Sequence, residues 1–359
     1  MVTVSLCMIA KNEEAVLARC LDSVKSLVDE IIIVDTGSND RTKEIALRYT
    51  DQVYDFTWID DFSAARNFSF SKAKMMYCLW LDADDLLLPQ DQTEFLSLKR
   101  SLSLDVDIVM MKYHVAFDQN GVPTYSYYRE RLIRRLSGFC WKGEVHEAIS
   151  LGGKVEYSEI GIMHQKLGQG DVNRNLNIFE KLMASGKKLE PRQRFYYGRE
   201  LFYHHRWLEA IDTFDGFLKE GRGWIENNID ACRLLSACYL ELGNEEEGLR
   251  RLLQSFIYAS PRAEVCCDIG AVFMRWKKWE QAIYWYQQAL HCTRNDRSGG
   301  FVMPDCYGYI PALQLCVCYD KLGDIEMACR YNELAGQLHP ESEAYLFNRK
   351  YFAGLGIAK

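Results

Sequence analysis

The sequence contains no apolar run long enough to cross a membrane, for which about 20 consecutive apolar residues are needed. The apolar start, residues 1–10, has no basic segment ahead of it and meets Lys11 too soon to form a signal peptide. We therefore expect a cytoplasmic protein without a transmembrane segment.

A surplus of basic residues is also missing. The chain has 43 lysines and arginines against 50 aspartates and glutamates, which gives a formal net charge of -7. A protein that binds duplex nucleic acid normally presents a clustered basic surface that neutralises the phosphates. We therefore expect no nucleic-acid partner.

Cysteine pairs with the spacing of zinc ligands are absent as well. The 13 cysteines are odd in number, extend from Cys7 to Cys329 and include no CxxC pair. A disulfide framework normally has an even number of cysteines, and a zinc site normally has closely spaced cysteine pairs. Reduced, buried thiols are the better interpretation.

The length and the hydrophobic pattern indicate two folded domains. A chain of 359 residues exceeds the size at which a single hydrophobic core stops growing. In its first part, short apolar runs alternate with segments of helical period, which is the pattern of a mostly parallel sheet. The expected strands span residues 2–9, 30–34, 53–56 and 77–81, and the expected helices span 13–26, 41–49 and 62–73. We predict an α/β nucleotide-binding domain here.

Further strand-like stretches span residues 108–117, 125–136 and 154–163. We expect them to join the edge of the sheet as antiparallel strands. Beyond about residue 170 the strands vanish and the period becomes helical. The predicted division is therefore 1–170 for the α/β domain, 171–190 for a linker helix and 191–359 for an all-α domain.

An internal repeat organises the all-α part. Each copy carries a small residue in the second helix of a pair, and these residues recur every 34 to 46 positions. They are Ala210, Gly248, Ala282 and Ala328. The spacing is near the tetratricopeptide period of about 34 residues. We predict about four tetratricopeptide-like units, with Tyr203, Tyr239 and Tyr319 in the layer between close-packed helices.

Three acidic residues follow an apolar strand in the segment Leu79-Trp80-Leu81-Asp82-Ala83-Asp84-Asp85. Ligands of open α/β sheets bind beyond the carboxyl ends of the strands. Asp82 and Asp84 can point to one side once the strand has ended, where they could hold a hard divalent cation that also contacts a diphosphate. The alternative is that these acids only cap the next helix.

Four motifs occur in the order and spacing of a known family. They are Asn12-Glu13, the segment 29–42, Ala65-Arg66-Asn67-Phe68 and Leu81-Asp82-Ala83-Asp84-Asp85. Over about residues 2–165 the chain resembles family 2 glycosyltransferases with the GT-A fold. It looks most similar to the lipopolysaccharide-core β-1,4-glucosyltransferase branch, which has counterparts of Arg131-Leu132-Ile133-Arg134-Arg135 and Val145-His146-Glu147. The repeat half resembles that of the sublancin-type peptide glycosyltransferases.

The resemblance implies a nucleotide-sugar pocket. Its residues would be Ala10, Lys11, Asn12, Glu13, Asp35, Arg66, Asp82, Ala83 and Trp141. Asp35 would accept a hydrogen bond from the base or the ribose, unless it only forms the turn before Gly37. Arg66 would lie near the diphosphate or orient the acids, because a guanidinium group matches both phosphate and carboxylate. A bare helical arginine would instead be a surface charge.

The resemblance also implies a metal cofactor, Mn²⁺ or Mg²⁺. Asp82 and Asp84 would be ligands, with His164 as a third, as a late histidine sometimes is in GT-A enzymes. The cation would stabilise the charge on the departing nucleoside diphosphate. The alternative for His164 is an ordinary hydrogen-bonded histidine at a strand end.

The segment 139–147 is the expected acceptor side. Trp141 offers a ring for stacking, and Glu144, His146 and Glu147 offer titratable groups. We prefer Glu147 as the general base of an inverting reaction, ahead of His146 and Glu144. The Glu-Asp pair of many family 2 enzymes is absent, and His146-Glu147 stands in its place.

The leading functional hypothesis is transfer of a hexose, glucose from UDP-glucose, to a peptide or protein side chain, since tetratricopeptide stacks usually present a groove to polypeptides. A rival is a saccharide or lipid-linked acceptor in cell-surface polymer synthesis. A non-catalytic repeat scaffold is a hypothesis of another class, against which the intact Asp35, Asp82 and Asp84 argue. Exposed repeat faces would also permit a homodimer.

Overall fold

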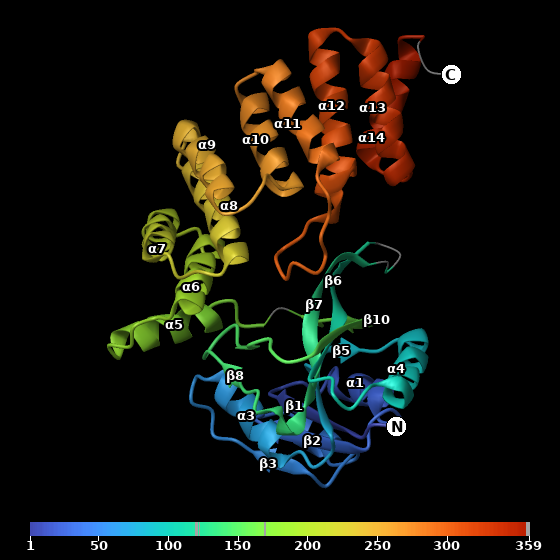
Figure 1. The fold of residues 1–359 in the computed structure, drawn as a ribbon, viewed down its shortest axis with the longest axis vertical. Helices are drawn as coiled ribbons and strands as arrows, with labels where there is room; N and C mark the ends of the chain where they lie inside the picture. The colour runs from blue at the N-terminus through green and yellow to red at the C-terminus, as the bar shows by residue number, and fades with distance from the viewer. Residues whose placement is uncertain (119–120, 122, 169, 357–359) are drawn as a thin grey trace. The chain divides into compact units, whose positions relative to one another are not determined.

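The computed structural model describes residues 1–118, 121, 123–168 and 170–356 (Figure 1). The chain divides into two compact units, Met1–Lys188 and Leu189–Lys359. The first is an α/β domain and the second an array of helix pairs, which confirms the predicted fold class. Among the described residues, each helix is too short or too polar to cross a membrane.

An eight-stranded sheet forms the centre of the first unit, in the order β3-β2-β1-β4-β7-β6-β10-β5. Its strands are β1 (Val4–Ala10), β2 (Glu30–Asp35), β3 (Val53–Asp55), β4 (Tyr77–Trp80), β5 (Asp85–Leu86), β6 (Ile108–Phe117), β7 (Pro123–Arg134) and β10 (Val155–His164). The strands β1 to β4 pair in parallel, as predicted. A separate ribbon consists of β8 (Trp141–Lys142) and β9 (Ala148–Ile149).

The later strands differ from the expected antiparallel edge. The strand β7 is antiparallel to both of its neighbours, β4 and β6, but lies inside the sheet. The strand β10 pairs with β6 in parallel, so the expectation is wrong for this strand. The reason is geometric, because β7 already occupies one side of β6. Because β7 runs antiparallel to β6, a strand that reverses direction after β7 runs parallel to β6. It can pair only with the other edge of β6, which is still open.

Helices cover both faces of the sheet, which explains its continuous apolar strands. They are α1 (Leu17–Val24), α2 (Thr42–Ala46), α3 (Phe62–Lys72) and α4 (Pro89–Ser101), and α5 (Arg174–Ala184) follows the sheet. Leu6 of β1 packs in one core cluster with Leu17 of α1 and Phe95 of α4. The next residue, Cys7, points to the opposite face and packs in a cluster that Phe70 of α3 borders. Consecutive apolar residues are therefore buried on opposite faces.

The second unit consists of the pairs α6–α7, α8–α9, α10–α11 and α12–α13, followed by α14 (Glu343–Gly354). The paired helices are α6 (Pro191–Tyr203), α7 (Trp207–Glu220), α8 (Ile225–Glu241), α9 (Glu245–Gln254), α10 (Ala263–Arg275), α11 (Trp279–His291), α12 (Tyr309–Leu322) and α13 (Ile325–Leu338). A residue with left-handed backbone closes the turn inside each pair. These residues are His205 (φ 57°), Gly243 (φ 77°), Lys277 (φ 58°) and Gly323 (φ 80°).

The small repeat residues behave as predicted, but one of the tyrosines does not. Ala210, Ala282 and Ala328 are 0% exposed, as close helix packing requires. Tyr319 stacks on Tyr331 with ring centroids 5.5 Å apart. Tyr203, however, is 56% exposed, so its predicted place between helices is wrong. It is the last residue of α6, where the helix leaves the packed layer.

We expect Gly323→Ala to destabilise the protein by about 1 kcal/mol, because a Cβ raises the energy of the left-handed backbone. A methyl group would touch nothing within 4 Å at this site, so backbone strain is the whole effect. Lys277→Gly should be neutral or stabilising by up to about 1 kcal/mol for the converse reason. Urea unfolding followed by circular dichroism measures both changes.

The matched control is Gly354→Ala at the end of α14, where an added methyl group also meets nothing within 4 Å and the backbone is helical. This change should not destabilise. Equal stability of Gly323→Ala and wild type would contradict the explanation.

Candidate functional site

The loops that follow β1 and β2 are joined by hydrogen bonds beyond the carboxyl ends of these parallel strands. The Asn12 N–H donates to Ser38 Oγ (3.0 Å), and the Asn39 N–H donates to Asn12 Oδ1 (2.8 Å). The Glu13 N–H donates to Thr42 Oγ1 (2.7 Å). Asn12 has a φ of 56°, a left-handed conformation that asparagine adopts more readily than most residues. The first motif is therefore positioned by the loop after β2.

Asp35, the last residue of β2, has one oxygen available to a ligand. Its Oδ1 accepts hydrogen bonds from the N–H groups of Gly37 and Ser38, both at 2.9 Å. Its buried Oδ2 has no hydrogen-bond partner within the described chain. Such an atom costs about 1–3 kcal/mol when left unpaired. Nearby, Ala10 ends β1 and is 4% exposed, while Lys11 is exposed.

The three aspartates after β4 occupy different positions in a tight turn. The Asp85 N–H donates to the Asp82 carbonyl group (3.0 Å), and the Asp82 N–H donates to Asp85 Oδ2 (3.0 Å). Ala83 is buried in the core. Asp85 is fully buried, and its Oδ2 accepts from Arg131 Nη1 (2.9 Å), which is equally buried. The turn thus buries Asp85 next to a counter-charge.

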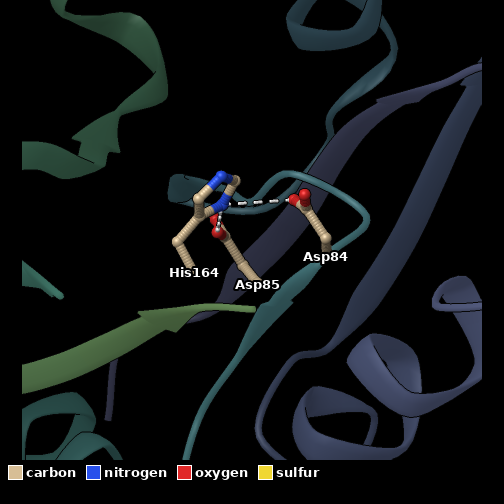
Figure 2. A group of neighbouring side chains, drawn as sticks. All are labelled: Asp84, Asp85 and His164. Carbon is tan, nitrogen blue, oxygen red and sulfur yellow. Dashed lines mark hydrogen bonds and ion pairs between the residues drawn. The ribbon is translucent and has the colours of Figure 1, made fainter. Parts of the chain in front are cut away.

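Figure 2 shows His164, at the end of β10, with a ring nitrogen directed at two of these acids. His164 Nδ1 lies 3.3 Å from Asp84 Oδ1, 3.2 Å from Asp85 Oδ1 and 2.7 Å from Tyr113 Oη. Ligand atoms of Asp84, Asp85 and His164 lie within 4.8 Å of one another. Carboxylates suit Mg²⁺ and Mn²⁺, and imidazole suits transition metals. The three residues form a candidate metal site.

This group overlaps with the metal ligands expected from the sequence. The structure brings Asp84 and His164 together, and adds Asp85, which the sequence prediction did not include. The side chain of Asp82 points elsewhere, because its Oδ1 accepts from Arg66 Nη2 (2.8 Å). The third acid of the run was visible in the sequence, but its contact with a strand 79 residues later was not.

Arg66 connects Asp82 with the acceptor-side loop. Its Nε donates to Glu147 Oε1 (2.6 Å), and its guanidinium group lies 4.7 Å from the Trp80 ring and 5.0 Å from the Trp141 ring. Its Nη1 is buried without a partner among the described residues. Burial favours the neutral acid of Asp82, but the positive charges of Arg66 and Arg131 and the hydrogen bond from Arg66 together outweigh it and hold the pKa of Asp82 well below its usual range.

Trp141 is not the open stacking surface that we expected. Its side chain is 2% exposed and packs against Trp80, with ring centroids 4.9 Å apart at 86°. The Asn67 side chain makes two hydrogen bonds to the main chain of Trp141, one with its N–H and one with its carbonyl group, each 2.9 Å long. The ring instead supports Arg66 from one side. The sequence could not reveal this, since the partners come from α3 and β4.

The three candidate bases lie in one turn, in different surroundings. Glu147 is 11% exposed and is held by Arg66. Glu144 forms an ion pair with Lys187, and its carbonyl group accepts from the Phe62 N–H (2.9 Å). His146 has a left-handed backbone with a φ of 53°. The choice among them stays a prediction.

Glu13 and His164, which lie beside these acids, both have a raised pKa. Burial and then the negative charges of Asp84 and Asp82 raise the pKa of Glu13 to about 7. Burial disfavours the charged form of His164, but the hydrogen bonds and charges of Asp84 and Asp85 outweigh it and raise its pKa to about 10. The site therefore holds a proton on His164 at neutral pH.

Comparison with known proteins finds a family match within the α/β domain and relatives that cover part or most of the chain. Residues 5–151 match the family model "Glycosyl transferase family 2". A stretch of 97 residues is 48% identical to a TPR repeat-containing protein of Synechococcus elongatus and covers 27% of this chain and 24% of that protein. Over 258 residues the chain is 26% identical to the SPbeta prophage-derived glycosyltransferase SunS of Bacillus subtilis, covering 67% of this chain and 60% of that one.

A solved structure, that of S. aureus TarS, aligns with a TM-score of 0.40 at 13% identity and covers 70% of this chain and 55% of the other. The chain thus spans between 24% and 60% of the length of the two curated relatives. The matched family segment contains Asp35, Arg66 and the three aspartates after β4.

We expect Arg131→Met to destabilise the protein by about 3–5 kcal/mol, because it leaves the buried Asp85 carboxylate without its counter-charge. Adding Asp85→Asn should recover much of this loss, since removal of both charges from a buried pair is often nearly neutral. Chemical denaturation of the two variants measures the difference. The control is Arg41→Met, whose side chain is 71% exposed and which should change stability by less than about 1 kcal/mol. A similarly small effect of Arg131→Met would contradict a buried ion pair.

A cation that binds Asp84, Asp85 and His164 must displace the imidazole proton, because ligands bind metals in their deprotonated form. Since the pKa of His164 is raised to about 10, Mn²⁺ affinity should rise about tenfold per pH unit between pH 6 and 8. Titration calorimetry at pH 8, where Glu13 with its pKa of about 7 is already ionised, should show release of about one proton per ion bound when buffers of different ionisation enthalpy are compared. His164→Gln should abolish that release. Equal heats in both buffers for the unaltered chain would rule out displacement at this histidine.

Proposed function

The α/β domain belongs to glycosyl transferase family 2, and on this premise we propose that the chain is an inverting, metal-dependent hexosyltransferase. The donor is the UDP-sugar UDP-glucose, and the acceptor is a peptide or protein side chain. One observation carries the proposal. Beside the carboxyl ends of β2 and β4, the buried atoms Asp35 Oδ2 and Arg66 Nη1 are polar and lack partners within the described chain.

Asp35 serves the nucleotide in this proposal. An acceptor atom that is buried and unpaired is satisfied by an N–H of the base or a hydroxyl of the ribose. The neighbouring wall comes from Ala10, Lys11, Asn12 and Glu13, which the loop after β2 holds in place. A rigid wall of this kind lowers the entropy cost of binding the nucleotide.

Arg66 serves the diphosphate. Its Nη1 would donate to a phosphate oxygen, while its other nitrogens keep the bonds to Asp82 and Glu147. The Trp80 and Trp141 rings hold the guanidinium plane. Because it is buried with paired acids, this cation stays charged at every working pH. It therefore offers a preorganised charge where the leaving group develops negative charge.

The donor set of Asp84 and His164, with Asp85 or Asp82 beside it, fits Mn²⁺ or Mg²⁺. When bound, the cation supplies Lewis-acid stabilisation of the departing UDP. The protein contributes the orientation of the ligands. Tyr113 and Asp85 fix the His164 ring, and Arg131 fixes Asp85.

Glu147 is the proposed general base. Arg66 binds Oε1 of this carboxylate, which orients the group, and the second oxygen can take the proton of an acceptor hydroxyl or thiol. Attack from the side opposite the leaving UDP gives inversion at the anomeric carbon. His146 and Glu144, in the same turn, are the alternatives. A peptide acceptor is supported by the repeat unit and by the resemblance to sublancin-type transferases.

Release of UDP from UDP-glucose in the presence of Mn²⁺ tests the proposal, since many transferases slowly hydrolyse their donor. Asp84→Asn should lower the rate at least about a hundredfold, because several kcal/mol of charge stabilisation are lost. Intact-mass measurement of candidate peptides after incubation with several nucleotide-sugars then identifies the acceptor and the sugar.

The control is Asp22→Asn on α1, whose side chain is 56% exposed and which should leave the rate unchanged. Normal turnover by Asp84→Asn would exclude this aspartate as a ligand. If the unaltered chain neither bound the donor nor released UDP, a non-catalytic scaffold would be favoured.

A further inference from the structure

The connection between α11 and α12 is longer than the helix pairs require. Residues 292–308 separate these helices, with only the short turn η3 (Pro304–Tyr307) among them, whereas residues 221–224 suffice between α7 and α8. Figure 1 shows the connection as the orange loop before α12. Its residues 299–303 pack against α6, α8 and α10, the first helices of the three preceding pairs.

Three contacts hold this segment in the manner of a bound peptide. The Arg199 guanidinium group, on α6, lies 4.1 Å from the centre of the Phe301 ring. Arg233 Nη2, on α8, donates to Met303 Sδ (3.7 Å). The Met303 N–H donates to Glu264 Oε1, on α10 (2.8 Å). One ring contact, one side-chain contact and one main-chain contact therefore come from three successive pairs.

The residues before Phe301 must be small. Gly300 is buried, and a Cβ at this position would lie 2.0 Å from Glu226 Oε2. Gly299 has a φ of +79°, and a Cβ there would lie 3.0 Å from the Trp224 ring. The surface that Trp224 and Glu226 present therefore accepts a main chain at close range, but not a bulky side chain.

The charges along this surface are balanced, which indicates the class of ligand. Arg233 Nε donates to Asp268 Oδ2 (2.6 Å), and Arg262 Nη2 donates to Glu226 Oε1 (2.7 Å). The Phe301 ring borders a small pocket, whose lining combines Ile229 and Val265 with charged side chains such as Arg233 and Glu264. Walls whose charges are paired suit a peptide of low net charge that is anchored by an aromatic ring, and they disfavour a polyanion.

We propose that this surface, defined by Arg199, Arg233, Glu264 and Glu226 and here named the repeat groove, binds an extended polypeptide. The ligand has two small residues followed by an aromatic residue. Residues 299–303 occupy the groove in cis, and the ligand displaces them. Binding itself is independent of catalysis, and only the assignment of the ligand as the acceptor rests on the proposed function.

Fluorescence polarisation with a labelled peptide of the sequence of residues 296–305 tests the proposal, using the full chain and no nucleotide-sugar. Phe301→Ala vacates the ring position, so the peptide should bind this variant at least tenfold more tightly than wild type. Gly300→Ala should act likewise, because its Cβ meets Glu226 and expels the segment. The control is Phe347→Ala on α14, 73% exposed, which should bind as wild type does.

Adding Arg199→Ala or Arg199→Lys to Phe301→Ala should weaken binding at least tenfold, since neither alanine nor lysine can stack a guanidinium plane on the ring. A peptide with alanine in place of its phenylalanine should not bind. The proposal is overturned if folded Phe301→Ala and Gly300→Ala, judged by circular dichroism, bind no more tightly than wild type. UDP release is measured separately, so peptide binding without UDP release would overturn the catalytic proposal alone, and UDP release without peptide binding would overturn only this one.

Discussion

Two guanidinium groups make the acid cluster after β4 possible. Carboxylates so close together repel one another, and a buried one is unstable without a counter-charge. Arg131 reaches Asp85 from β7, and Arg66 reaches Asp82 from α3. Both cations also pack on the Trp80 ring, at 3.7 Å and 4.7 Å. With Asp82 and Asp85 neutralised in this way, Asp84 has His164 as its counter-charge, a ring that Asp85 also contacts.

The pairing also joins two parts of the candidate site. The guanidinium group that holds Asp82 holds Glu147 through a second nitrogen, so the end of β4 and the turn after β8 share one cation. A displacement of Arg66 would therefore alter both carboxylates at once. The same group keeps a third nitrogen without a partner in the part of the chain that the structure describes. A single residue thus links the donor side to the acceptor side of the proposed reaction.

The repeat unit follows a different rule, since its helices contact mainly their sequence neighbours. Small residues and left-handed turns repeat along it, and half-buried arginines balance half-buried acids, as in the contact of Arg233 with Asp268. The segment 299–303 is the exception. It returns to helices of three earlier pairs, and the glycines at 299 and 300 allow the close approach.

Local pattern by itself determined the two kinds of domain, the parallel strands β1 to β4 and the small residues of the helix pairs, because apolar period and repeat spacing can be read along the chain. The order of the motifs also placed Asp35, Arg66 and the acids after β4 at one end of the sheet. Tertiary structure decided the partners: Trp141 is buried, Asp85 joins His164, and β10 runs parallel to β6. The physical reason is that a side chain's surroundings depend on strand order and on counter-charges that arrive from distant residues. No pattern of neighbours along the chain encodes either one.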